Sequence, residues 1–265
     1  MKNILLLVHD DDGQEARLQT ALDLTRALEG HMSCIDVTML PMMAADIHGG
    51  TAQAVLLEEE RAREGENKAA VTDRLKNEDV SWDWTDVIGG MAQAVLDAST
   101  LADLIVLNRK LDAYSYPDMR DIASSIVMKA RAPIVAVPET QKSFGIERAL
   151  IAWDGSESCA ATMRACTGLL KLSTEVRIFT ALEKSNGLEP TAAAQYLSRH
   201  GIHVTIETVE RADNEPDQLI SAHAESWKAD YVMMGAYGKG RLREAFGGVT
   251  KRMLGSSQMP LLLGH

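Results

Sequence analysis

Runs of apolar residues alternate with amphipathic segments along the whole chain. In the C-terminal part, nearly continuous apolar runs predict strands at 148–153, 174–182, 203–210, 230–235 and 260–264. The amphipathic segments between them predict helices at 156–171, 190–200, 215–228 and 247–256. Strands without polar alternation are typical of a parallel sheet that helices cover on both faces. Because repeated strand–helix units cross over with a right hand, the pattern predicts an α/β fold with a doubly wound sheet.

The apolar pattern of the first half recurs in the second. Residues 5–10 (LLLVHD) correspond to residues 149–154 (ALIAWD), and both runs close with an Asp before a helical segment. Two further pairs of segments share a single offset: 102–107 with 229–234, and 132–137 with 259–264. Three matches in the same order indicate an internal repeat.

We therefore predict two Rossmann-like domains in tandem, each built on a doubly wound five-stranded parallel sheet. The first domain spans 1–138, the second spans 148–265, and the linker is 139–147. The final strand of each domain is apolar and would form an exposed edge, so we expect the two final strands to cover each other. The first half is longer because it contains the charged stretch 57–78, which predicts an extended, solvated helix.

Composition narrows the class of protein. The chain has 27 basic and 38 acidic residues, and its net charge of −11 disfavours wholesale binding of nucleic acid. The three cysteines form no CxxC motif, which favours a reducing, cytoplasmic setting, and Cys159 and Cys166 are expected in the core. The first apolar run ends in three aspartates and predicts a strand rather than a signal peptide. No apolar stretch approaches the roughly 18 residues of a membrane span.

Polar and glycine-rich loops follow two strands of the second half. In an open parallel sheet, ligands bind beyond the carboxyl ends of the strands, where the strand order reverses, which here is between the first and fourth strands. Asp154-Gly155-Ser156 follows the first of these strands, and Ser156 is expected to cap the next helix. The segment 235–240 (GAYGKG) follows the fourth strand, and a helix begins near Gly247. Glycine backbone N–H groups and a helix N-terminus together predict an anion site.

The charges of the two halves differ in the same region. Residues 1–144 contain 14 basic and 24 acidic residues, whereas residues 145–265 contain 13 and 14. The segment 235–252 carries one acid, Glu244, against five cations: Lys239, Arg241, Arg243, Lys251 and Arg252. The corresponding segment 108–125 balances three cations with three acids and contains no glycine. The sequence therefore predicts an anion site in the second half alone.

The order of these motifs resembles the universal stress protein family. The shared pattern is a strand with Asp-Gly-Ser, and a later strand followed by Gly-x2-Gly, a spacer of about nine residues and Gly-[Ser/Thr]. The whole chain is similar to a tandem member of the family, with two adenine-nucleotide α-hydrolase-like domains. In nucleotide-binding members the first-strand Asp and the residues before it hold adenine and ribose, and the glycine motif wraps the phosphates. The resemblance therefore implies base and sugar contacts from Ala152, Trp153 and Asp154, and phosphate contacts from Gly235, Tyr237, Gly238, Gly247, Gly248, Val249 and Thr250.

The sequence departs from the family pattern in two places. Val249 stands where a Ser or Thr is expected, so the hydroxyl is lost or displaced to Thr250, at a cost of about 0.5–1.5 kcal/mol. In the first half, Asn108 and Leu111 occupy the positions of Gly235 and Gly238, and Asp11 and Asp12 beside Asp10 would repel phosphate. These departures predict that the N-terminal domain is a degenerate member of the family and that the chain holds one nucleotide.

The sequence leaves two main classes of function. The first is a universal stress protein that binds ATP or another adenine nucleotide, with or without Mg²⁺, in stress response or signalling, and is at most a slow ATPase. The second is a partner-interaction module that binds no nucleotide and retains a relic glycine loop. A third, an adenylyl-transferring or ATP-hydrolysing enzyme, ranks lower because Glu244 is the only acid near the expected phosphates. The chain shows no catalytic triad, and no metal site is predicted. Expected partners are the nucleotide and the other half of the chain, as an internal pseudo-dimer; a further homodimer is left open, and no membrane or nucleic acid is expected.

Overall fold

The computed structural model describes residues 1–39, 49–110, 118–182, 187–210, 214–236 and 248–265. The N-terminal half contains the elements β1 Asn3–Val8, α1 Gln14–Ala27, β2 His31–Met39, α2 Gly49–Leu75, β3 Ser81–Gly89, α3 Met91–Ala98, β4 Leu104–Lys110, α4 Met119–Lys129 and β5 Ile134–Pro138, with a 3-10 turn η1 at Ser99–Leu101. The C-terminal half contains β6 Arg148–Ala152, α5 Glu157–Ala165, α6 Thr167–Leu170, β7 Glu175–Leu182, α7 Pro190–Arg199, β8 Val204–Glu210, α8 Pro216–Trp227, β9 Tyr231–Gly235, α9 Gly248–Ser256 and β10 Leu261–Gly264.

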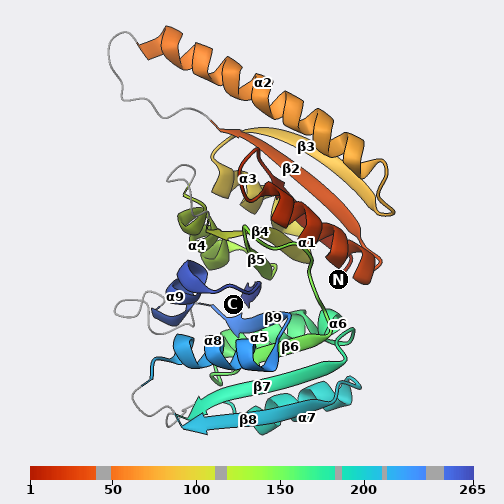
Figure 1. The fold of residues 1–265 in the computed structure, drawn as a ribbon, viewed down its shortest axis with the longest axis vertical. Helices are drawn as coiled ribbons and strands as arrows, with labels where there is room; N and C mark the ends of the chain where they lie inside the picture. The colour runs from red at the N-terminus through yellow and green to blue at the C-terminus, as the bar shows by residue number, and fades with distance from the viewer. Residues whose placement is uncertain (40–48, 111–117, 183–186, 211–213, 237–247) are drawn as a thin grey trace.

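One ten-stranded sheet runs through the whole molecule, in the order β3-β2-β1-β4-β5-β10-β9-β6-β7-β8 (Figure 1). Within each half all neighbouring strands are parallel, and the order reverses beside the first strand, between β1 and β4 and between β6 and β9. The predicted α/β fold with doubly wound five-stranded sheets is confirmed. The two five-stranded sheets are joined into one because β5 and β10 pair antiparallel, with Val135 opposite Leu262.

The core has two layers, one on each face of this sheet. Successive residues of a strand point to opposite faces, so Leu6 joins one layer while Leu5 and Leu7 join the other. The alternation continues across the seam between the halves, where Leu262 belongs to the layer of Leu6 and Leu261 to the opposite layer. Both layers therefore extend through the two halves without a polar break at the seam.

The linker between β5 and β6 is attached to both halves. Phe144 is buried, its backbone N–H donates to Asp23 of α1 at 2.8 Å, and its ring stacks on Tyr231 of β9 with centroids 5.4 Å apart. A second contact between the halves comes from β4, where Arg109 donates from Nη1 to the carbonyl of Leu254 near the end of α9 at 3.2 Å. These contacts hold the last helix of the chain against the N-terminal half.

The predicted elements of the C-terminal half are present, with one interruption. The helix expected at 156–171 divides into α5 and α6 at Cys166. The hydroxyl of Thr167 donates to the carbonyl of Met163, a back-bond of the kind that bends helices. Cys159 and Cys166 are fully buried free thiols, as expected, and burial raises the pKa of Cys159 to about 12.

The long helix α2 begins before the predicted charged stretch and is only partly solvated. Its exposed positions include Glu58 and Glu59, whereas Glu64 is buried with 2% of its surface exposed. The prediction of a solvated helix face over the acidic run is wrong at Glu64. None of the helices in the described part of the chain is both long and apolar enough to cross a membrane.

Candidate functional site

The first loop of the predicted nucleotide site lies at the end of β6. Trp153 is 4% exposed, and its indole N–H donates to the carbonyl of Leu188 at 2.9 Å. Asp154 is exposed and accepts the backbone N–H of Ser156 at 2.9 Å. Ser156 in turn caps α5 by accepting the backbone N–H of Cys159, as the sequence predicts. Trp153 therefore anchors the segment before α7, while Asp154 presents its carboxylate to solvent.

Gly155 and Leu188 close this loop through their backbones. Gly155 has a φ of +73°, in the left-handed region that favours glycine, and its carbonyl accepts the N–H of Leu188 at 2.9 Å. A Cβ at Gly155 would lie 2.8 Å from the carbonyl oxygen of Leu188. The glycine of the Asp-Gly-Ser motif is thus required by the turn itself.

Gly235 ends β9 beside this loop, because β6 and β9 are neighbours with Ala152 opposite Met234. A Cβ at Gly235 would lie 2.5 Å from the backbone nitrogen of Cys159 and 2.7 Å from Oγ of Ser158. Real Cβ atoms do not approach backbone so closely, so only glycine lets α5 lie against the end of β9. The structure therefore brings Ala152, Trp153, Asp154 and Gly235 together at the reversal of strand order.

The helix α9 supplies the other described residues of the predicted phosphate site. Gly248 starts the helix, Val249 packs in part against the core, and Thr250 is buried. Among the five predicted cations, Arg252 is bound by acids of the neighbouring helix α8: its guanidinium lies 2.6 Å from Asp217 and 2.9 Å from Glu215. Arg252 is therefore neutralised locally, and the expectation of five cations for a phosphate overstates the positive charge. Tyr237, Gly238, Gly247, Lys239, Arg241 and Arg243 lie outside the described residues.

The equivalent crevice of the N-terminal half is filled by side chains. Arg17 of α1 is completely buried and donates to the carbonyls of Leu7 and His9, to Asn108 and to Asp11. Asn108, at the position of Gly235, is also fully buried. Asp11 was expected from the sequence to repel phosphate, but its carboxylate is paired with the Arg17 guanidinium at 2.8 Å.

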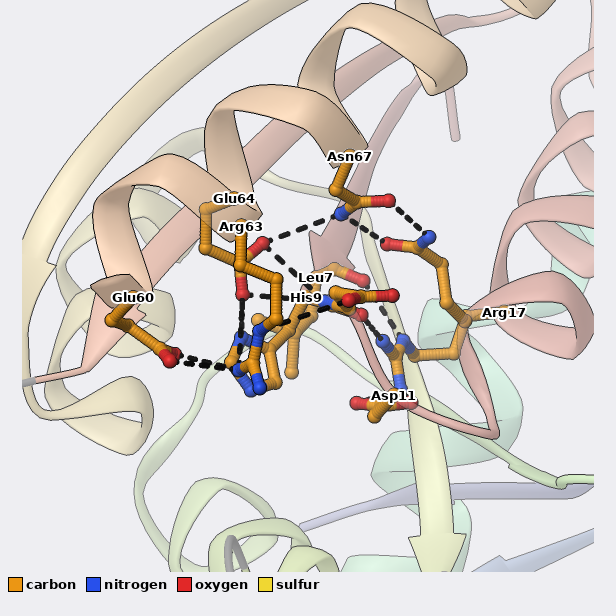
Figure 2. A network of polar contacts seen from close by, with 10 residues as sticks. Leu7, His9, Asp11, Arg17, Glu60, Arg63, Glu64 and Asn67 are labelled. Carbon is orange, nitrogen blue, oxygen red and sulfur yellow. Dashed lines mark hydrogen bonds and ion pairs between the residues drawn. The ribbon is translucent and has the colours of Figure 1, made fainter. Parts of the chain in front are cut away.

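Beside this filled crevice, His9 and α2 form a second polar group of residues (Figure 2). His9 directly follows β1, as Trp153 directly follows β6 in the other half, and it is 1% exposed. Its Nδ1 lies 2.6 Å from Oε1 of Glu64, whose carboxylate also accepts the backbone N–H of Asp10 at 3.3 Å. In both halves, therefore, the residue after the first strand contacts the segment that follows the second strand.

The electrostatics of this group are set by burial. Asp36 of β2 is 3% exposed, and desolvation, followed by the charges of Glu64 and Asp86, raises its pKa to about 7. Burial also opposes ionisation of Glu64, but His9 and the N–H of Asp10 hold the pKa of Glu64 below its usual value. Sequence reasoning missed this group because Glu64 reads as part of a solvated run; the spacing of Glu60 and Glu64, one helical turn apart, was the available signal.

Comparison with known proteins identifies the architecture. Residues 145–264 match the family model described as the universal stress protein family. No curated protein matches the chain. A universal stress protein from Archaeoglobus fulgidus DSM 4304 has a similar structure, with a TM-score of 0.77 and 16% identity over 99% of this chain and 97% of that one. A putative universal stress protein from Pseudomonas aeruginosa UCBPP-PA14 has a TM-score of 0.60 and 14% identity, over 100% and 93% of the two chains.

Proposed function

The chain belongs to the universal stress protein family through its C-terminal half, and on this premise we propose that this half binds ATP or another adenine nucleotide. The observation that carries the proposal is the meeting of the Asp154 loop and Gly235 at neighbouring strand ends, where the strand order reverses. Asp154 presents an exposed carboxylate to a sugar hydroxyl or a base N–H. The remaining phosphate contacts are assigned to Tyr237, Gly238, Gly247, Gly248, Val249 and Thr250, with Mg²⁺ as a companion of the phosphates.

The proposed role is nucleotide-dependent signalling in a stress response, with slow turnover at most. The described side chains of this loop are engaged in hydrogen bonds: Asp154 accepts the N–H of Ser156, and the hydroxyls of Ser156 and Ser158 are bonded to each other. The N-terminal half is proposed to bind no nucleotide, because Arg17 and Asn108 occupy its crevice.

The two halves are proposed to act as an internal pair. The support is the antiparallel pairing of β5 with β10 together with the contact of Arg109 with Leu254. The final strand of each half is covered by the other, which removes an exposed apolar edge.

Titration calorimetry with ATP and with adenosine tests the nucleotide site. We expect one site per chain. Asp154→Ala should weaken both ligands about tenfold or more, since a hydrogen bond to a charged group contributes about 1.5–3 kcal/mol. The matched control is Asp10→Ala, the same position in the N-terminal half, which should leave affinity unchanged. Two equivalent sites per chain, or equal losses in the two variants, would refute the proposal.

A further inference from the structure

Three side chains of types that can ligate a metal converge where α2 crosses the end of β1. His9, Glu60 and Glu64 each place one possible ligand atom within 4.8 Å of the others. Glu60 and Glu64 are one helical turn apart, so they leave α2 on the same side, and Figure 2 shows this side facing His9. The three donors thus come from two elements that are far apart in the sequence but packed together.

The group also contains buried polar atoms that have no hydrogen-bond partner among the described residues. Nδ1 of His9, in a residue 1% exposed, lies 2.6 Å from Glu64 but in a geometry that is not that of a hydrogen bond. Within the part of the chain that the structure describes, Oδ1 of Asp36, in a residue 3% exposed, has no hydrogen-bond partner, while the Asp36 carboxyl as a whole interacts with that of Glu64. Buried polar atoms in proteins are almost always satisfied. An imidazole nitrogen held against a carboxylate in poor hydrogen-bond geometry, with a second carboxylate beside them, points to a ligand that accepts electron pairs from both residue types.

We propose that His9, Glu60 and Glu64 bind a divalent transition-metal ion, Zn²⁺ by preference, with the Asp36 carboxylate beside it. One imidazole nitrogen with carboxylate oxygens is a donor set that suits Zn²⁺. Bonds of about 2.0–2.2 Å in a tetrahedron separate neighbouring ligand atoms by about 3.3–3.6 Å. The Nδ1 of His9 and Oε1 of Glu64 need to separate by about an ångström or less to reach that spacing, and Glu60 needs to approach.

Arg63 lies beside this site and already pairs with both of its glutamates, at 3.9 Å in the case of Glu64. Its Nη2 lies 2.8 Å from Glu60, and its Nε lies 3.7 Å from Asp10, so it has an alternative acid nearby. Half of the Arg63 side chain is exposed, which leaves it room to turn towards Asp10. An incoming cation therefore competes with Arg63 for Glu60, and the arginine keeps a partner when the metal binds.

Metal binding here would hold α2 to the sheet. The helix spans 27 residues, and it contacts the residues after the first strand through Glu64 and Arg63. Since the ligands belong to separate elements, binding free energy adds directly to the stability of the folded N-terminal half.

The test is Zn²⁺ titration of the chelator-treated full chain, with Co²⁺ absorption to report the ligand field. We expect one site per chain, a rise in the thermal midpoint with Zn²⁺, and visible Co²⁺ bands. Glu60 is partly exposed, so the Glu60→Gln variant should fold. It should weaken Zn²⁺ binding at least about tenfold, because the loss of even an outer-shell partner weakens metal binding by that factor. Glu59→Gln, an exposed neighbour on the same helix, is the matched control and should bind as the wild type does.

A second variant separates a metal site from an ordinary acidic surface. Arg63→Gln removes the competing cation and should raise Zn²⁺ affinity about two- to fivefold, the range set by exposed ion pairs. Zn²⁺ binding that is absent, or that is equally strong in Glu60→Gln and Glu59→Gln, overturns the proposal. A loss of Zn²⁺ affinity in Arg63→Gln also overturns the proposal, because Arg63 would then favour ion binding rather than compete with the ion for Glu60.

Discussion

The two halves of the molecule place different side chains at the same crevice. Counted from the start of the first helix of each half, Arg17 corresponds to Ala160, and Asn108 corresponds to Gly235. In the N-terminal half the larger pair meets in the interior, with Arg17 bonded to Asn108 and to two strand-end carbonyls. In the C-terminal half Ala160 is partly exposed and Gly235 lets the helix approach.

The different residues at these two positions change the space and the charge in the crevice without changing the fold. Each of the three nitrogens of the buried guanidinium donates a hydrogen bond, so the N-terminal crevice is a structural centre that is filled by the protein's own cation. The C-terminal crevice lacks such a side chain among its described residues. One repeat is therefore stabilised by buried polar side chains at the crevice for which we propose nucleotide binding in the other repeat.

The largest effect is expected from removing Arg17. Arg17→Ala leaves Asp11, Asn108 and two carbonyls buried without their donor, so the free energy of unfolding should fall by about 3–5 kcal/mol. Arg26→Ala, on the same helix but a third exposed, should cost about 1 kcal/mol or less. Denaturant unfolding of both variants measures the difference. Equal losses would mean that the filled crevice contributes no special stability.

A smaller effect is expected from Gly235→Ala. The new methyl group would meet the backbone of Cys159, so α5 must shift, at a cost of about 1–3 kcal/mol. Gly255→Ala is the matched control, because nothing lies within 4 Å of its Cβ and alanine favours a helix by about 0.5–1 kcal/mol. Thermal unfolding of the two variants should move in opposite directions; a neutral Gly235→Ala would show that α5 and β9 are not closely packed.

The smallest effect concerns the pH dependence of the C-terminal half. His223 of α8 stacks on Phe179, and burial, with a contribution from Arg177, lowers its pKa, while Glu207 acts in the opposite sense. The unfolded chain therefore takes up the proton more readily, and stability that is complete above the ordinary histidine pKa of about 6.5 declines as the pH falls through the lowered value. His223→Gln should flatten this acid limb in urea midpoints measured from pH 8 to pH 5. If the urea midpoint of His223→Gln fell with pH as steeply as that of the wild type, the acid sensitivity would come from other groups. Leu96 stands at the corresponding position of the N-terminal half, which has no such group there.

Much of the fold could be predicted from sequence because buried parallel strands leave continuous apolar runs. The structure confirms two kinds of local signal. The apolar runs at 149–152 and 231–235 are strands, and Gly155 forms the turn between β6 and α5. The crevice could be located for the same reason, since topology alone brings the ends of the first and fourth strands together.

The occupants of the crevices could not be predicted, because long-range contacts leave no local pattern. Arg17 lies in an amphipathic helix where a charged residue ordinarily indicates the solvent face, yet it is fully buried. Glu64 reads as one acid in a charged run, and Arg252 as one cation in a basic one. Only packing between α2 and β1, and between α8 and α9, shows that each has a specific partner.

The attached linker changes how the central seam responds to dilution. When two separate chains join through their last strands, the fraction joined falls as protein concentration falls. Here β5 and β10 belong to one chain, and Phe144 fixes the connecting segment to α1 and β9. Closing the seam is then an intramolecular step with an effective concentration set by nine residues of restrained linker, 139–147. The molecule can consequently keep its two unlike crevices in one fixed arrangement at any level of expression.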